Sequence, residues 1–150
     1  MDVVIRAALA GDADFLIACN AAMALETEHK SLDPNVLGPG VRNLLSRPEL
    51  GFYLVAEKNG APAGCLMVTQ EWSDWRNGLF WWVQSVYVQP AFRRTGIYRL
   101  LYGHVKELAR QARNVIGFRL YVEKDNLAAQ GTYRAMGMGE TDYRLFEEGL

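Results

Sequence analysis

The stretch that most constrains the fold is LFWWVQSVYV, residues 79–88, which is apolar at almost every position. A strand of this composition is typical of the centre of a sheet whose two faces are both covered. Residues 97–113 then carry apolar side chains at helical spacing, and residues 116–123 have the pattern of another strand. Two strands joined through a helix are expected to be parallel, with a right-handed crossover.

The remaining segments predict a single domain over residues 1–150. Two strands within residues 51–72 meet at Asn59 and Gly60, the dipeptide that tight type I′ hairpins prefer. Prolines and glycines in residues 32–40 are expected to break the chain between two helices. The other expected elements are strands at 3–6 and 141–148 and helices at 11–29, 41–48 and 126–137. The order β-α-α-β-β-β-α-β-α-β predicts an α/β (α+β) fold, with a mixed central sheet and helices on both faces.

Charge and composition exclude several classes of protein. The formal net charge is −1, which argues against a uniformly basic protein that binds nucleic acid. No apolar run approaches the roughly 20 residues that a membrane span needs, and the N-terminus has no leader pattern. The two cysteines and two histidines lack the spacing of a zinc site, so no metal is expected. We expect a cytoplasmic protein whose Cys19 and Cys65 remain reduced thiols.

The junction QPAFRRTGIY, residues 89–98, connects the long apolar strand to the following helix. A helix that starts after RRTG directs its first free N–H groups into the loop, where they attract an anion. Arg93 and Arg94 add positive charge, and Gly96 lets the backbone approach a ligand closely. The junction therefore predicts a diphosphate site. The alternative is a polar turn with solvated arginines, because the stretch lacks both the P-loop ending and the three-glycine dinucleotide pattern.

Two stretches, VQSVYVQPAFRRTGIYRLLY and LYVEKDNLAAQGTYRAMGM, together resemble the GNAT superfamily of N-acetyltransferases, in particular its bacterial small-molecule type. The first is similar to the acetyl-CoA motif Gln/Arg-x-x-Gly-x-Gly/Ala, with Arg93 and Gly96 in its first two fixed positions. Tyr98 departs from the motif, where the family usually has Gly or Ala. The second is similar to the Asn-x-x-Ala…Tyr…Gly-Phe/Met ending of the family, filled by Asn126, Ala129, Tyr133, Gly137 and Met138.

The resemblance implies that acetyl-CoA is the cosubstrate. Backbone groups of residues 86–88 would bind the pantetheine arm and polarise the acetyl carbonyl, and residues 93–98 would hold the pyrophosphate. Asn126 would contact the cofactor from the start of the last helix. The expected cofactor-binding residues are Val86, Tyr87, Val88, Arg93, Arg94, Thr95, Gly96, Ile97, Tyr98, Asn126 and Tyr133.

The expected catalytic residues are Tyr133 and Glu71. Tyr133 matches the tyrosine that protonates the departing sulfur in many family members, and the alternative is that it packs its ring in the core. The acceptor amine must lose a proton, because a lysine-like amine has a pKa of about 10.4. No glutamate lies on the long strand, so the base is sought among Glu71, Asp74, Glu26 and Glu28, acting through water. Each of these could also be an ordinary surface carboxylate.

All four tryptophans lie within residues 72–82, together with Glu71 and Asp74. Acids beside aromatic faces attract a cationic amine, although neighbouring tryptophans on a strand could instead fill the two faces of the sheet. The expected substrate residues are Glu26, Glu28, Trp72, Trp75 and Gln84.

The residues and the resemblance together predict an N-acetyltransferase that modifies a primary amine of a small molecule in a ternary complex. Two other functions remain open: a catalytically silent acyl-CoA-binding or regulatory module, and a protein N-terminal or lysine acetyltransferase. We expect a small-molecule partner, no nucleic acid and no membrane. An exposed edge or the apolar final strand could support a homodimer.

Overall fold

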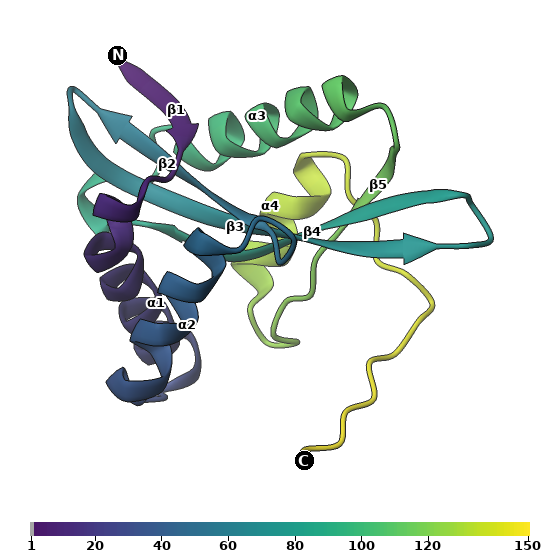
Figure 1. Ribbon diagram of the computed structural model, residues 1–150, viewed down its shortest axis with the longest axis horizontal. Helices are drawn as coiled ribbons and strands as arrows, with labels where there is room; N and C mark the ends of the chain where they lie inside the picture. Colours follow the sequence, from purple (N-terminus) through teal and green to yellow (C-terminus); the bar gives the residue numbers. More distant parts are fainter. Residues whose placement is uncertain (1) are drawn as a thin grey trace.

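One five-stranded sheet organises the computed structural model, which describes residues 2–150 (Figure 1). The strands are β1 (Val3–Ala7), β2 (Phe52–Lys58), β3 (Ala61–Ser73), β4 (Gly78–Val88) and β5 (Val115–Arg119), and they lie side by side in this order. The first four run antiparallel to their neighbours, whereas β4 and β5 are parallel. Helix α3 (Ile97–Ala112) connects this parallel pair, as the sequence predicts.

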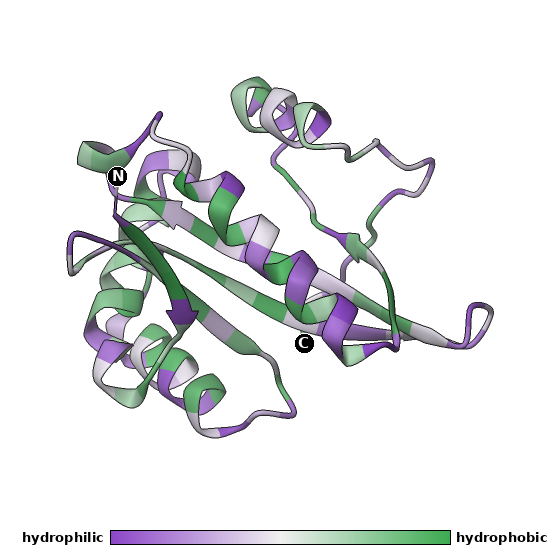
Figure 2. Ribbon diagram, turned by 90° about the horizontal axis from the view of Figure 1, so that it is seen from above, coloured by the Kyte–Doolittle hydropathy of each residue, from purple (hydrophilic) through white to green (hydrophobic). Residues whose placement is uncertain are grey.

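Helices cover both faces of the sheet. The helices α1 (Ala13–Glu28) and α2 (Pro34–Ser46) pack on one face, where Leu16, Val41 and Val55 are buried. Helix α3 covers the other face with a stripe that includes Leu101 and Val105 (Figure 2). These layers confirm the expected α/β class. None of the helices within residues 2–150 is long and apolar enough to span a membrane.

The hairpin between β2 and β3 confirms the expected turn. Asn59 and Gly60 both adopt positive φ angles, 53° and 82°, as the central residues of a type I′ turn must. The next hairpin is much longer, because β3 and β4 pair from Cys65 with Tyr87 out to Ser73 with Gly78. Its outer end projects beyond the rest of the sheet (Figure 1).

Helix α2 corrects one expectation, since it begins seven residues earlier than the helix predicted at 41–48. Asp33 caps it by accepting a hydrogen bond from the backbone N–H of Asn35, and Pro34 occupies the first turn, where its missing N–H is not needed. Pro39 lies inside the helix on an exposed face. Burial of Val41 and Leu44 against α1 and the sheet offsets the cost of that interior proline.

The chain ends with helix α4 (Leu127–Ala135) and a segment that we call the tail, residues 139–150. The final strand expected at 141–148 is not formed: these residues are exposed and make no ladder with another strand. The tail runs away from β5 and α4 instead (Figure 1). An alternating pattern predicts the strand conformation, but a strand also needs a neighbouring edge that the chain can reach.

Candidate active site

Strands β4 and β5 diverge, and this divergence opens the centre of the molecule. They pair only from Leu79 with Val115 to Trp82 with Arg119, although β4 continues to Val88. A bulge at Ser85, whose φ angle is 51°, bends β4 where the register with β3 shifts. The edge of β4 that faces β5 therefore has no strand neighbour after Trp82, which leaves backbone N–H and C=O groups available to a ligand.

The loop from β4 to α3 leads directly into a helix N-terminus without a side-chain cap. Arg94 and Gly96 both adopt left-handed conformations, with φ angles of 62° and 83°, and Gly96 is the N-cap residue. The hydroxyl of Thr95 donates to the backbone carbonyl of Phe92 and stabilises the turn. The first N–H groups of α3 are thus not satisfied by a cap, and such groups attract anions.

A cavity of about 680 Å³ lies between β4, this loop and α4. Val86 and Val88 give it an apolar wall, and Arg94 and Arg99 place two cations near the N-terminus of α3. The small side chains of Ala128, Ala129 and Thr132 on α4 leave the interior open. The other lining residues are Phe92, Arg93, Gly96, Ile97, Tyr98, Tyr133, Ala135 and Met136.

Most of the expected cofactor-binding residues therefore meet at one cavity. Phe92, Arg99 and, on α4, Ala128, Thr132 and Ala135 line the cavity without having been predicted from the sequence. Ala128 and Thr132 are four residues apart, as are Ala129 and Tyr133, so helical spacing from the expected Tyr133 was the signal that could have found them.

Arg93 lines this cavity but turns its guanidinium toward Glu26. Its Nε donates to the carbonyl of Val88 at 2.8 Å, its terminal nitrogen pairs with Glu26 at 2.9 Å, and the guanidinium lies over the ring of Tyr87. The Tyr87 hydroxyl donates to the other oxygen of Glu26 at 2.8 Å. The hydrogen bond from Arg93, and then that from Tyr87, lowers the pKa of Glu26, so this carboxylate is charged at neutral pH.

Tyr133 lies between two cavities, because it lines both the one just described and a second one beyond β5. Burial raises the pKa of Tyr133, so its hydroxyl keeps its proton at neutral pH. Its ring packs edge-on against Tyr98, with ring centroids 5.8 Å apart. Tyr98 in turn stacks on Tyr102, and its buried hydroxyl has no hydrogen-bond partner among the described residues. The bulky residue at this motif position is thus held by other aromatic rings.

Two expected site residues make structural contacts instead of facing the first cavity. The Oδ1 of Asn126 caps α4 by accepting from the backbone N–H of Ala129 at 3.1 Å. Glu71 accepts from Arg119 at 2.7 Å and from the indole of Trp82 at 3.1 Å. Arg119 also lies 3.6 Å above the ring of Phe80, so Glu71 belongs to a packed ion pair on the sheet.

The structure does not bring the expected substrate residues together. Trp72 and Trp75 lie at the outer end of the β3–β4 hairpin, 59% and 87% exposed. Glu28 is exposed beside Lys30. Gln84 binds Thr69, on the face of the sheet that α1 and α2 cover.

Trp81 is buried on the α3 side against Phe52, with Trp82 on the opposite face. The alternative interpretation, that these two tryptophans fill the two faces, is therefore confirmed.

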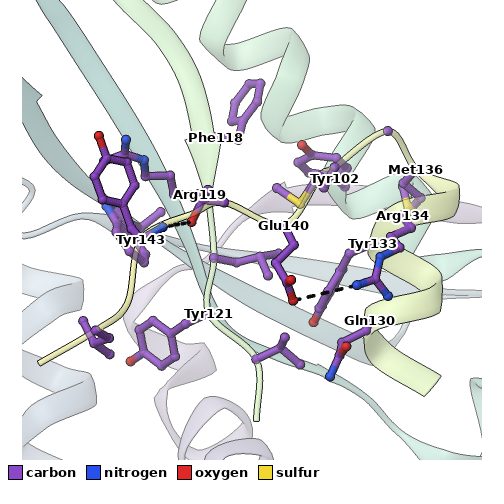
Figure 3. A pocket seen from close by; sticks show the side chains of 18 of the residues that line it. Tyr102, Phe118, Arg119, Tyr121, Gln130, Tyr133, Arg134, Met136, Glu140 and Tyr143 are labelled. Atoms are coloured by element: carbon purple, nitrogen blue, oxygen red, sulfur yellow. Dashed lines mark hydrogen bonds and ion pairs between the residues drawn. The ribbon is translucent and has the colours of Figure 1, made fainter. Parts of the chain in front are cut away.

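The second cavity has a volume of about 990 Å³ and lies beside the outer edge of β5. Tyr133 and Gln130 of α4 face Tyr121 and Tyr143 across it (Figure 3). The first half of the tail forms its outer wall. In the part of the chain that the structure describes, no three His, Cys, Asp or Glu side chains gather as a metal site requires.

Comparisons with known proteins agree with this architecture. A sequence model of the Acetyltransferase (GNAT) family matches residues 19–138. A solved structure of a possible acetyltransferase from Clostridium difficile 630 is 42% identical, covers 99% of this chain and 97% of its own, and superposes with a TM-score of 0.92. No curated protein matches the chain.

Two more distant structures share the fold. A predicted acetyltransferase with acetyl-CoA from Clostridium acetobutylicum is 19% identical, with a TM-score of 0.80 over 98% of this chain and 96% of its own. A ribosomal-protein-alanine N-acetyltransferase from Brucella melitensis is 16% identical, with a TM-score of 0.79 over 99% of each chain.

Proposed function

The chain belongs to the acetyltransferase (GNAT) family, and on that premise we propose that it acetylates the primary amine of a small molecule by direct attack in a ternary complex. Acyl transfer with acetyl-CoA as the donor follows from the family. The acceptor and the roles of individual residues are our proposal. The observation that carries it is the divergence of β4 from β5 beside the uncapped N-terminus of α3.

The donor side of the proposal follows the walls of the 680 Å³ cavity. Acetyl-CoA supplies an activated acyl group on an extended arm that ends in a diphosphate and a nucleotide. The unpaired edge of β4 at residues 86–88 would bind the amide-containing arm through backbone hydrogen bonds. The first turn of α3, with Arg94 and Arg99, would hold the diphosphate. Both parts of the cavity therefore fit the donor.

For proton transfer we propose Tyr133 as the acid and Glu26 as the base. Tyr133 keeps its proton at neutral pH and lines the donor cavity from α4, as an acid that protonates the leaving sulfur should. Glu26 is charged and contacts Arg93, which lines the donor cavity, and Tyr87 of β4. The Glu26 carboxylate would attract the ammonium form of the acceptor and accept a proton from it through water.

Glu71 remains a second candidate for the base. Its contacts with Arg119 and Trp82 on the sheet tie it to the edge of β5. Glu26 makes contacts of the same kind, but its partner Arg93 lines the donor cavity, whereas Arg119 does not, and Glu26 is therefore the preferred base.

We keep a small molecule as the preferred acceptor because Gln84 and Glu26 offer polar groups on the side of the sheet that α1 and α2 partly cover. A protein N-terminus is the alternative that the fold also accommodates, and a catalytically silent acyl-CoA-binding module is the other. The two free cysteines in the core favour a reducing compartment, the cytoplasm. We keep a homodimer as the proposed assembly.

The test is incubation of the purified chain with isotopically labelled acetyl-CoA and separate panels of small amines and N-terminal peptides. Thiol release would report turnover, and mass spectrometry would identify the labelled product. Acetylation of a small amine is expected. Acetylation of peptides alone would replace the preferred acceptor, and binding of acetyl-CoA without turnover in any panel would favour the silent module.

A further inference from the structure

We infer that the acceptor is an α,ω-diamino acid, whose zwitterionic head is bound by the ion pair of Glu71 and Arg119 and whose terminal amine is acetylated. The pair would thus be a receptor for a group that carries both charges. The inference rests on the proposed acetyl transfer and adds to it the chemical class of the acceptor.

The ion pair lies on the α1 side of the sheet, beyond the part that α1 and α2 cover. Side chains alternate along β4, and Trp81 is buried on the α3 side, so Trp82 and Gln84 point to the α1 side. The buried cluster under α1 and α2 takes in β2, the first part of β3 and the end of β4. The β3–β4 hairpin extends past these helices (Figure 1). Glu71 and Arg119 are therefore within reach of a ligand, with side chains 43% and 24% exposed.

Each member of the pair has polar atoms left for a ligand. The Oε1 of Glu71 accepts from Arg119 and from the indole of Trp82, whereas its Oε2 has no hydrogen-bond partner within residues 2–150. Arg119 uses one terminal nitrogen for Glu71, and its Nε and other terminal nitrogen donate to no group in the same part of the chain. A guanidinium has five N–H donors in a planar fork. The pair therefore presents a free acceptor and several free donors side by side.

Aromatic rings fix the pair in place. The guanidinium carbon of Arg119 lies 3.6 Å from the centroid of the Phe80 ring. The Trp82 ring, whose indole N–H holds Glu71, packs against Tyr121 with ring centroids 5.9 Å apart. A binding group that is already held in its bound geometry loses less side-chain entropy when a ligand arrives. These contacts favour a pre-formed site over a mobile surface ion pair.

The charges of the pair select the head group of the ligand. A ligand that carries only a cation is repelled by Arg119, and one that carries only an anion is repelled by Glu71. A group with an ammonium and a carboxylate on neighbouring atoms matches both charges. Its ammonium would donate to the Oε2 of Glu71, and its carboxylate would accept from the free donors of Arg119. The head of an α-amino acid is such a group.

The position of the pair relative to the donor site gives the length of the acceptor. Arg119 pairs with Trp82 in the sheet, and Gln84 lies two residues further along β4, roughly 7 Å away. The bulge at Ser85 follows, beyond which we propose that the donor arm binds. An extended chain covers ~1.2 Å per bond, so roughly six bonds separate the head from the reacting amine. This is the spacing of the two nitrogens in lysine.

One cavity reaches from the pair to the proposed acid. Trp82, Arg119 and Tyr121 line the 990 Å³ cavity, and so does Tyr133, which also lines the donor cavity. The volume is at the upper end of the range that small-molecule sites occupy. A small acceptor held at the pair can therefore meet the donor where the two cavities adjoin.

The group transfer is that of the proposed function. The terminal ammonium of the acceptor loses one proton to Glu26 through water, and its nitrogen forms a bond to the acetyl carbon. The carbon–sulfur bond breaks, the sulfur takes the proton of Tyr133, and the second proton of the nitrogen restores Tyr133 through water. The products are the diamino acid acetylated at its terminal nitrogen, the free thiol and one proton.

The test compares three matched amines: lysine, 1,5-diaminopentane, which lacks the carboxylate, and 6-aminohexanoate, which lacks the α-amine. In the wild type, kcat/KM for lysine should exceed that for each of the others about tenfold, the scale of a hydrogen bond to a charged group. Arg119→Met leaves Glu71 without its partner and should prefer 1,5-diaminopentane to lysine. Glu71→Gln should instead prefer 6-aminohexanoate. These preferences are ratios within one variant, so they do not depend on how much of it is folded.

Matched controls come from an exposed ion pair on α3. Arg110→Met and Glu107→Gln each remove one partner of that pair and should keep the wild-type order of the three amines. Fragmentation of the lysine product in the mass spectrometer should place the acetyl group on the terminal nitrogen.

Several results would overturn the inference. They are a wild type that acetylates lysine no better than the other two amines, equal losses for all three amines in Arg119→Met and Glu71→Gln, and acetylation of the α-nitrogen. Turnover of another small amine, with none of these three accepted, would overturn the inference and leave the proposed function intact. Absence of thiol release with every amine would end both.

Discussion

Arg93 and Tyr133 make different uses of their polar atoms. Arg93 donates hydrogen bonds to the carbonyl of Val88 and to the carboxylate of Glu26. These bonds connect the end of α1 to the end of β4. Tyr133 lines both cavities, and burial raises the pKa of its hydroxyl, which therefore stays protonated at neutral pH. The first residue therefore builds the site, and the second is available for proton transfer.

Replacing Tyr133 by Phe removes the proposed acid while keeping the ring. We expect kcat to fall about 10²-fold, because a positioned acid contributes 10²–10⁴-fold. The KM for acetyl-CoA should change less than threefold. Steady-state kinetics with thiol detection measures both. Tyr53→Phe, which removes a hydroxyl from the α1 side of the core, should leave both values unchanged; equal losses in the two variants would remove Tyr133 from the mechanism.

Replacing Glu26 by Gln removes the charge that we propose attracts the acceptor amine. The kcat/KM for the amine should fall by more than tenfold, roughly the 1.4 kcal/mol of one such interaction. Since the pKa of Glu26 is lowered, the wild type should keep this advantage down to acidic pH and lose it only as the carboxylate protonates below its ordinary pKa. Glu107→Gln, on the exposed face of α3, is the control; an unchanged pH profile in Glu26→Gln would exclude the proposal.

At the scale of elements, the start of α3 depends on one backbone conformation. Gly96 has a φ angle of 83°, and nothing lies within 4 Å of where a Cβ would be. An alanine there would be destabilised by its left-handed backbone conformation and not by a steric clash. We expect Gly96→Ala to weaken CoA binding five- to tenfold, because a left-handed alanine costs about 1 kcal/mol.

Titration calorimetry with CoA measures that change. The matched control is Gly103→Ala in the interior of α3, where a Cβ also meets nothing. The control should raise stability by roughly 0.5–1 kcal/mol and leave CoA binding unchanged. Equal affinities of the Gly96 variant and the wild type would contradict the role given to this turn.

The entry into α1 depends on an ion pair with β1. Asp12 accepts two hydrogen bonds from Arg6 and one from the N–H of Leu9, and the bonds from Arg6 are the main reason that its pKa is lowered. A carboxylate with a lowered pKa stabilises the folded state above its unfolded pKa, and that contribution is lost as pH falls through the folded value.

Asp12→Asn should therefore reduce the free energy of unfolding by about 2 kcal/mol at pH 7, the scale of hydrogen bonds to charged groups. The difference from the wild type should shrink below about pH 4. Urea denaturation at pH 7 and pH 3 measures it. Asp14→Asn, whose carboxylate is almost fully exposed, should have little effect at either pH, and similar losses in the two variants would contradict the ion-pair explanation.

The elements that the sequence predicted well are those whose pattern is local. The Asn59-Gly60 turn, the apolar β4 and the amphipathic α3 each have a signal within their own residues. The start of α2 was predicted too late because Pro39 indicates a break in the chain. The packing of the helix on α1 and the sheet outweighs this local effect. The strand expected at 141–148 failed for a different reason: its alternating pattern is local, but the segment forms no ladder with another strand.

The same distinction applies to the candidate site. The loop before α3 carries its motif in ten residues, so its position at the cavity followed from sequence. Trp75 is close to Val88 in sequence, but an eleven-residue strand such as β4 spans roughly 35 Å and separates them. The contacts of Arg93 with Glu26 and of Arg119 with Glu71 join distant segments, and no spacing rule could have predicted them.

For the whole molecule, α4 stands between the two cavities, because Tyr133 and Met136 line both of them.

The divergence of β4 from β5 has a consequence for the evolution of substrate specificity in such proteins. The groups that we propose receive the arm of the donor at residues 86–88 belong to the peptide backbone, which every amino acid except proline supplies. Substitutions on this strand can therefore alter what is acetylated while the donor stays the same. A lineage built this way can acquire new acceptors one side chain at a time, and its descendants would share a reaction without sharing a substrate.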